Sequence, residues 1–227
     1  GRGRPKWAAG ELGKRFAVFC ALIVFLALPM WTWPGYCQAV LCAGLVAGGA
    51  EYWVAALNSG RAGFLEVPWL VATWCSWLAP TAVMIGGYED VLGHKKLVEC
   101  IFIQLAVGDS MQLFCGRLFG RTYICGRLSP KKTLEGYIGG FLVTLAYGMI
   151  VHRWPWDDVA VAFVAGCAGD LFFSSVKRRL GLKDFSRVLS SHGGVLDRID
   201  SFVFAINALY WRRVLLPPVA AVAGDAR

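Results

Sequence analysis

Asp170, Ser174, Lys177 and Arg178 combine residue types that bind metal ions and phosphates, at a spacing that a helix would bring together. Residues four, seven and eight positions apart lie on one side of an α-helix, so the four side chains would form a single stripe. A carboxylate in this stripe can hold a divalent cation, and the basic groups can bind phosphate oxygens. A topological explanation is equally open, because Lys177 and Arg178 would also suit the positive flank of a membrane helix.

The polar stretch that follows carries more groups of the same kind. Lys183 is followed by an aspartate, and the run His-Gly-Gly-Val-Leu-Asp-Arg-Ile-Asp occupies 192–200. The Gly-Gly pair permits a tight turn or a close approach to a ligand. Asp197 and Asp200, three positions apart, would share one helical face. Mg²⁺ commonly combines one or two carboxylates with substrate phosphates, so we expect the chemistry to centre on Asp170, Asp197 and Asp200.

Two other ionisable residues have alternative roles that the sequence leaves open. His192 could be a general base, or it could hold the Gly-Gly turn through a structural hydrogen bond. Asp109 lies within an apolar stretch. Ionisable groups at membrane depth usually face a polar cavity, although a polar contact between helices would also account for Asp109.

These residues are embedded in a chain that is too apolar for an ordinary soluble domain. Its 227 residues are 57% hydrophobic and 17% charged, and the mean hydropathy is +0.53. A spanning helix needs roughly 20 mostly apolar residues. Such stretches predict an all-α, polytopic transmembrane bundle with about seven spanning helices, near 16–33, 36–57, 67–88, 98–115, 137–154, 159–176 and 201–222.

The simplest domain organisation is a basic segment at 1–15 followed by one transmembrane domain at 16–227, with most of the polar motifs between 109 and 200. The stretch at 16–33 resembles a signal peptide, but no small-residue cleavage pattern follows it, so we expect a spanning helix. Because the chain starts with Gly1, we expect that it is an excerpt of a longer protein.

The net charge of +8 reflects membrane topology rather than nucleic-acid binding. Most of the 23 Lys and Arg residues fall in the N-terminal segment and in the loops at 58–66, 116–136 and 177–200. Alternating spans would place all of these on one side, which the positive-inside rule identifies as cytoplasmic, or its stromal or matrix equivalent. The eight cysteines form no C-x-x-C pair, so neither a disulfide framework nor a zinc site is indicated.

The polar motifs resemble the signature of the CDP-diacylglycerol synthases, also called phosphatidate cytidylyltransferases. The matching residues are Ser174-x-Val176-Lys177-Arg178, Lys183-Asp184 and His192-Gly193-Gly194-Val195-x-Asp197-Arg198-Ile199-Asp200. A second block, Ser129-Pro130-Lys131-Lys132-Thr133-Leu134-Glu135-Gly136, is similar to the family's S-P-K-K-T-x-E-G motif. It follows Asp109 and Gly116-Arg117-x-Phe119-Gly120. The chain departs from the family pattern at Ser190, Leu134 and Gln112-Leu113, and no departure removes a charged group.

The resemblance implies a multi-pass membrane enzyme that converts CTP and phosphatidic acid into CDP-diacylglycerol and pyrophosphate with Mg²⁺. It implies Asp170, Asp197 and Asp200 as metal ligands and catalytic residues, with Lys177 and His192 as further catalytic residues. The implied substrate-binding residues are Ser129, Lys131, Lys132, Ser174, Arg178, Lys183, Arg198 and Asp109. A second cation, monovalent or divalent, and a homodimer are left open.

Two other functions are compatible with parts of the pattern. Another CTP-dependent membrane enzyme, such as a polyprenol kinase or a CDP-archaeol synthase, would also need phosphate-binding residues and Mg²⁺. A transporter could use Asp109, Asp170 and Glu51 as coupling sites in the bilayer. The intact H-G-G-x-x-D-R-x-D block favours the cytidylyltransferase over the kinase. No broken helices in matching halves support the transporter.

Overall fold

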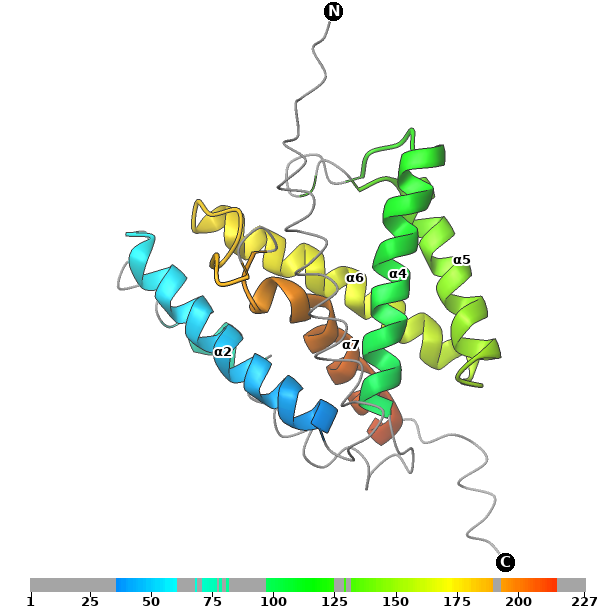
Figure 1. Ribbon diagram of the computed structural model, residues 1–227, viewed down its shortest axis with the longest axis horizontal. Helices are drawn as coiled ribbons and strands as arrows, with labels where there is room; N and C mark the ends of the chain where they lie inside the picture. The colour runs from blue at the N-terminus through cyan, green and yellow to red at the C-terminus, as the bar shows by residue number, and fades with distance from the viewer. Residues whose placement is uncertain are drawn as a thin grey trace, which may run out of the picture.

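Helices account for every regular element in the part of the chain that the structure describes. In this computed structural model the described residues are 36–60, 68, 71–76, 78, 81, 97–124, 129, 132–189 and 193–215 (Figure 1). The helices are α2 (Tyr36–Asn58), α4 (Leu97–Phe119), α5 (Leu134–Ile150), α6 (Trp156–Arg179) and α7 (Leu196–Leu215). Residues 68, 71–76, 78 and 81 are helical as well, and the only β-type pairing among the described residues is one isolated bridge between Tyr123 and Thr133. The expected all-α class is confirmed.

The predicted number of about seven spanning helices is not confirmed. Two helices in the described residues are long and apolar enough to cross a membrane, at Ala39–Asn58 and Trp156–Arg179. Helix α5 is apolar but has 17 residues, and α7 carries charged residues in both its first and its last turn. Of the other predicted segments, 16–33 lies outside the described residues and 67–88 is described only in part.

The helices associate as two pairs with a fifth helix laid against them. Helix α4 packs along α5, α6 packs along α7, and α2 lies against α7 (Figure 1). The loops that follow α4 and α6 both lie at the upper side of Figure 1. The pairing therefore brings the two polar loops of the sequence to the same end of the bundle.

Glycines allow the close approach within each pair. A Cβ atom on Gly136 of α5 would lie 2.7 Å from the backbone oxygen of Gln112 in α4. A Cβ atom on Gly169 of α6 would lie 2.7 Å from the backbone oxygen of Asp200 in α7. Small residues at such crossings let helix backbones approach closely, which is typical of membrane helix packing. At Gly169 the approach also fixes the distance of α6 from Asp200.

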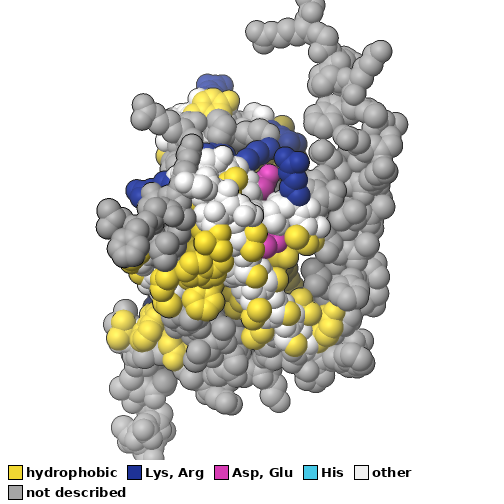
Figure 2. All heavy atoms as spheres, turned by 90° about the vertical axis from the view of Figure 1, so that its left-hand side faces the viewer, with side chains coloured by type: hydrophobic (Ala, Val, Ile, Leu, Met, Phe, Trp, Pro, Cys, Tyr) yellow, Lys and Arg dark blue, Asp and Glu magenta, His cyan; other side chains and the backbone are white. Residues whose placement is uncertain are grey.

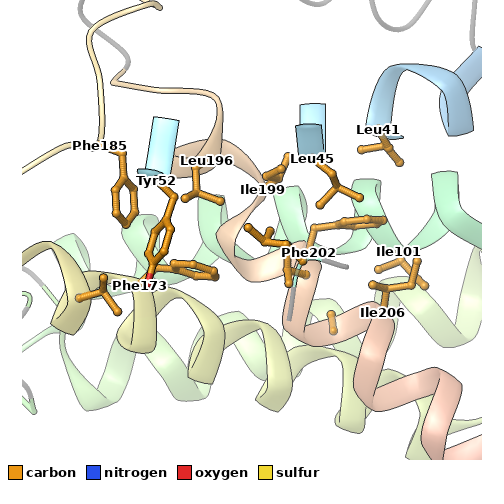
Figure 3. Packing of buried hydrophobic residues seen from close by; sticks show 14 of the residues in the cluster. Leu41, Leu45, Tyr52, Ile101, Phe173, Phe185, Leu196, Ile199, Phe202 and Ile206 are labelled. Carbon is orange, nitrogen blue, oxygen red and sulfur yellow. The ribbon is translucent and has the colours of Figure 1, made fainter. Parts of the chain in front are cut away.

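An aromatic cluster fills the core directly beside the polar loop after α6 (Figure 3). The ring centroid of Phe185, in that loop, lies 5.9 Å from Tyr52 of α2 and 6.2 Å from Phe173 of α6. All three residues are almost completely buried, as is Leu196 at the start of α7. Burying a large apolar side chain contributes about 1.5–3 kcal/mol, so Phe185 anchors the loop against α2 and α6.

Ion pairs join α6 and α7 at the end of the bundle opposite this loop. Arg212 pairs with Asp157 and Asp158, and Arg213 also pairs with Asp158. The side chain of Asp158 is 3% exposed, whereas that of Asp157 is 39% exposed. The acidic groups occupy the first turn of α6 and the basic groups the last turn of α7, where each charge is favoured by its helix dipole.

The difference in burial predicts unequal effects on stability. Asp158→Asn leaves two arginines without their shared buried counter-charge, and breaking a buried pair costs about 3–5 kcal/mol. Asp157→Asn removes a more exposed pair, for which less than about 1 kcal/mol is expected. Thermal unfolding of the purified variants measures both effects. Equal unfolding midpoints for the two variants would contradict this assignment.

Candidate active site

Lys177 joins two aspartates near the start of α7 to the end of α6. Its Nζ atom lies 2.7 Å from Oδ1 of Asp197 and 4.0 Å from Oδ2 of Asp200. The Lys177 and Asp200 side chains are 10% exposed and that of Asp197 is 4% exposed. Because one ammonium reaches both carboxylates, Asp197 and Asp200 share a helical face, as their spacing predicts. The arrangement neutralises charges that would be costly to bury alone.

Backbone groups of the loop after α6 hold the second oxygen of Asp197. Oδ2 accepts hydrogen bonds from the N–H of Phe185 at 3.0 Å and of Gly194 at 2.9 Å. The ring of Phe185 lies beneath the Lys177 ammonium, 5.5 Å from ring centroid to Nζ. Gly193 has a φ of 79°, in the left-handed region that favours glycine. The loop thus folds back onto Asp197 and fixes its orientation.

A second ion pair connects the loop before α5 to α6. Lys132 pairs with Asp170, and its Nζ atom also lies 5.5 Å from the ring centroid of Tyr137. Burial opposes the charged form of Lys132, but the carboxylate of Asp170 outweighs it and raises the lysine pKa above its usual range. This pair therefore unites residues from the two polar loops that the sequence analysis singled out.

Local hydrogen bonds close the loop that carries Lys132. The N–H groups of Arg121 and Thr122 donate to the carboxylate of Glu135, at 3.1–3.2 Å. Thr133 caps α5 by accepting from the N–H of Gly136. Hydrogen bonds from its own backbone N–H and from those of Arg121 and Thr122 lower the pKa of Glu135 to about 2. Lys132 therefore lies next to a capped helix start that is hydrogen-bonded to the residues directly after α4.

A small pocket with both polar and apolar lining lies between α4, α6 and α7, next to the Lys132–Asp170 pair. Its polar or ionisable lining consists of Asp109, Gln112, Lys132, Cys167, Asp170 and Ser201. Asp200 faces the charges of Asp170, Lys177 and Asp197, and its Oδ1 atom accepts from the N–H of Ser201 at 2.7 Å. The pocket and the Lys177 cluster are therefore neighbouring parts of one charged site.

The donor set fits a hard, partly hydrated cation. Within the described residues, no group of three or more His, Cys, Asp or Glu side chains is placed to hold a metal ion. Such a group is typical of zinc sites, whereas Mg²⁺ usually takes one or two carboxylates and completes its shell with water and phosphate oxygens. Asp170, which lines the pocket, and Asp200, which is close enough to interact with its charge, supply that smaller set.

The remaining residues that were singled out from the sequence occupy varied positions. Ser174 is buried on α6. Arg178 is exposed and donates to the backbone oxygen of Leu182 at 2.9 Å, so it caps the end of α6. Three further residues are exposed: Asp109, at the pocket, and Lys183 and Arg198. Ser129 accepts through its backbone oxygen from the N–H of Lys132. Lys131 and His192 lie outside the described residues.

Three residues of the site were not expected from its motifs. Glu51 of α2 accepts hydrogen bonds from the start of α7, Phe185 supports Lys177, and Gln112 presents a buried Oε1 atom without a partner beside the pocket. The sequence analysis considered Glu51 as a coupling site of a transporter, and no spacing rule relates a residue at 51 to one at 196. Its position as a polar residue at membrane depth was a signal that could have marked it as part of a site.

Charged and apolar side chains occupy different parts of one face of the molecule. On the face shown in Figure 2, Lys and Arg side chains gather at one end with acidic side chains among them, above a hydrophobic surface. The exposed apolar residues include Val46, Val54, Leu57 and Val164, all on the two helices long enough to cross a membrane. This pattern suits a protein whose polar site lies at the boundary of an apolar layer.

Comparison with known proteins gives one family. The sequence matches a family described as "Cytidylyltransferase family" over residues 10–215. Similar proteins include a phosphatidate cytidylyltransferase of Aquifex aeolicus, 39% identical over 111 residues, and one of Thermotoga maritima, 40% identical over 118 residues. These alignments cover 46% of this chain in both cases, and 42% and 44% of the respective relatives.

A phosphatidate cytidylyltransferase of Synechocystis is 38% identical over 153 residues, which cover 63% of this chain and 49% of that protein. The chain thus spans about half the length of the curated relatives that it matches. The match includes the motif region in which Lys132, Asp170 and the Lys177 cluster lie.

The lowered pKa of Glu135 predicts how the loop responds to acid. Since the folded-state value of about 2 is below the ordinary 4.5, the carboxylate stabilises the closed loop above pH 4.5. This stabilisation is lost as the pH falls toward 2. Hydrogen exchange at Arg121 and Thr122, corrected for intrinsic rates, should accelerate over this range in wild-type protein. In Glu135→Ala it should be fast and independent of this titration. Slow exchange in the variant would show that other contacts close the loop.

Proposed function

Because this chain belongs to the cytidylyltransferase family, we propose that it is a phosphatidate cytidylyltransferase, which forms CDP-diacylglycerol and pyrophosphate from CTP and phosphatidic acid. The names of its relatives in Aquifex aeolicus, Thermotoga maritima and Synechocystis support this assignment. The observation that carries it is the pairing of Lys132 with Asp170 beside the cluster of Lys177, Asp197 and Asp200.

The proposed reaction is a nucleotidyl transfer between two anions. A phosphate oxygen of phosphatidic acid attacks the α-phosphorus of CTP and forms a new P–O bond. The bond from the α-phosphorus to the bridging oxygen breaks, and pyrophosphate leaves with those electrons. The protein must therefore overcome mutual repulsion and hold the reactants in line, which is mostly electrostatic and positional work.

Lys132 and Lys177 suit this task because they enter the site from different elements. Lys132 lies in the loop between α4 and α5, whereas Lys177 lies in the last turn of α6. Each already contacts a carboxylate, so each ammonium group is held in place before a phosphate arrives. Arg198, exposed at the start of α7, adds a cation that can reach a substrate phosphate. Lys131, Ser129, Ser174, Arg178 and Lys183 remain proposed substrate-binding residues, and His192 remains a proposed catalytic residue.

The formal charges of the site favour a divalent cation as cofactor. Asp170, Asp197 and Asp200 outnumber Lys132 and Lys177, so this cluster alone carries a net negative charge and would repel polyphosphates. A bound Mg²⁺ would reverse that sign and polarise phosphate oxygens. Asp170 and Asp200 are proposed to hold the ion. Asp197, also expected as a ligand, has its oxygens engaged by Lys177, Phe185 and Gly194.

We further propose a multi-pass membrane location with the charged site at the cytoplasmic end or its organellar equivalent. The two helices long enough to cross a membrane support the location. The polar loops at one end of the bundle, rich in Lys and Arg, support the orientation under the positive-inside rule. A soluble nucleotide and a lipid headgroup could then meet at that end.

Incubating the purified protein with phosphatidic acid, Mg²⁺ and CTP labelled at the α-phosphorus tests the proposed function. The label should appear in a lipid product together with released pyrophosphate. Transfer of only the γ-phosphate, detected with γ-labelled CTP, would identify a kinase instead. Transmembrane flux without any turnover would identify a transporter.

Removal of the site carboxylates should stop this transfer. In Asp170→Asn and Asp197→Asn we expect kcat to fall by about a hundredfold or more. Asp170 is a proposed ligand of the cation, whose site supplies several kcal/mol to the transition state, and Asp197 holds Lys177 in place. Asp157→Asn, at the opposite end of α6, is the matched control and should keep wild-type turnover. Near-normal turnover in both site variants, with folded protein, would exclude the proposed site.

A further inference from the structure

Glu51 of α2 closes the N-terminus of α7, although 144 residues separate it from the first backbone group that it contacts. Its Oε1 atom accepts a hydrogen bond from the N–H of Val195, and Oε2 accepts one from the N–H of Leu196, both at 3.0 Å. Oε1 also accepts from the hydroxyl of Ser186 at 2.7 Å. Both oxygens of the carboxylate are therefore engaged by the segment that leads into α7.

The local sequence explains why α7 needs this contact. The first N–H groups of a helix lack partners within the helix, and a Ser, Thr, Asp or Asn at the N-cap usually satisfies one. The residues before Leu196 are Gly193, Gly194 and Val195, none of which has a side chain that can accept a hydrogen bond. A carboxylate from α2 supplies the missing acceptor and places a negative charge at the favourable end of the helix dipole.

The absence of a side chain at Gly194 makes the contact sterically feasible. A Cβ atom at this position would lie 2.4 Å from Oε2 of Glu51 and 2.8 Å from the hydroxyl oxygen of Ser186. Gly194 therefore lets the backbone approach the carboxylate. The N–H of Gly194 donates to Asp197. Gly194 therefore contacts both carboxylates, that of Glu51 and that of Asp197, and links the position of one to that of the other.

Glu51 also stabilises the other segment that holds Asp197. Ser186 directly follows Phe185 in the chain. Its hydroxyl donates to Glu51 and accepts a hydrogen bond from the N–H of Val188. The N–H of Phe185 in turn donates to Asp197. Glu51 thus fixes both backbone segments whose N–H groups orient the Asp197 carboxylate toward Lys177.

We propose that Glu51 is a positioning residue for the reaction. By binding the backbone at Val195 and Leu196 and the hydroxyl of Ser186, it holds the first turn of α7 so that Asp197 and Asp200 face Lys177 and the cation site. This role rests on the proposed function, but the contacts themselves can be tested without turnover. Glu51 contacts backbone and a hydroxyl in this arrangement, so it acts through the aspartates rather than on a substrate.

Glu51→Ala and Glu51→Gln separate the contributions of the carboxylate. Alanine removes every acceptor. Glutamine keeps one acceptor oxygen but turns an amide N–H₂ toward a backbone donor, so it should give an intermediate effect. Asp157→Asn is the matched control, since it also removes a carboxylate contact between helices but lies at the other end of α6. All three variants are compared with wild-type protein in phospholipid nanodiscs.

Three measurements distinguish positioning from a general loss of stability. Hydrogen exchange of peptides covering 193–197 should accelerate in Glu51→Ala and not in Asp157→Asn. Mn²⁺ shares the oxygen-ligand preference of Mg²⁺. Its affinity for Glu51→Ala, measured by electron paramagnetic resonance, should be about 10- to 100-fold lower than for wild-type protein. This is the usual effect of losing a residue that orients metal ligands. The kcat for lipid product should fall by a similar factor, with a smaller change in the KM for CTP.

Each contrary outcome has a definite meaning. Unchanged exchange at 193–197 would refute the cap. Faster exchange with wild-type Mn²⁺ affinity and kcat, or losses that only follow the fraction of unfolded protein, would refute the positioning role. Wild-type protein that binds Mn²⁺ but transfers no nucleotidyl group would refute the proposed function, while the exchange and Mn²⁺ differences would still decide the role of Glu51.

Discussion

An ammonium group buried at the end of an apolar bundle requires nearby negative charge, and the pairing of Lys177 with Asp197 and Asp200 meets this requirement. A buried charge without a partner costs several kcal/mol. Helix α7 therefore has to start where its carboxylates reach the last turn of α6. The loop between the helices has to fold back so that Phe185 packs beneath the ammonium and donates to Asp197.

The same constraint explains why the site forms at the junction of the two helix pairs. Lys132, from the α4–α5 pair, contacts Asp170 of α6, which faces Asp200 of α7. The close contacts at Gly136 and Gly169 bring the helices of each pair near enough for these side chains to meet. The glycine contacts determine the distance between the helices, and the ion pairs between side chains depend on that distance.

The helices and the common face of Asp197 and Asp200 could be predicted from the sequence. Long apolar stretches predict the helices, and the three-residue spacing of Asp197 and Asp200 predicts their common face, because both follow from helical geometry alone. Helical spacing places Arg178 on the same side of α6 as Asp170, Ser174 and Lys177, but it does not determine what the side chain contacts. The Arg178 side chain is exposed and donates to the backbone oxygen of Leu182, a contact that depends on the loop after α6.

Contacts between residues distant in the chain could not be predicted in this way. The pairing of Lys132 with Asp170 requires the α4–α5 pair to lie beside α6, and local periodicity contains no information on that arrangement. The number of spanning helices could not be predicted for the same reason. Apolar composition does not tell whether a helix such as α7, with charged residues at both ends, is surrounded by lipid or by protein.

The contact between α2 and α7 shows that the polar motifs are not structurally autonomous. The H-G-G-x-x-D-R-x-D run supplies the carboxylates and the glycines, but Gly193, Gly194 and Val195, directly before α7, have no side chain that can accept from its first N–H groups. The acceptor comes from Glu51, and the adjacent Tyr52 packs against Phe185 of the same loop. One helical turn of α2 thus contributes both a polar and an apolar contact to the segment that orients Asp197. A change in the packing of α2 would therefore reach the site without altering any residue of the motif.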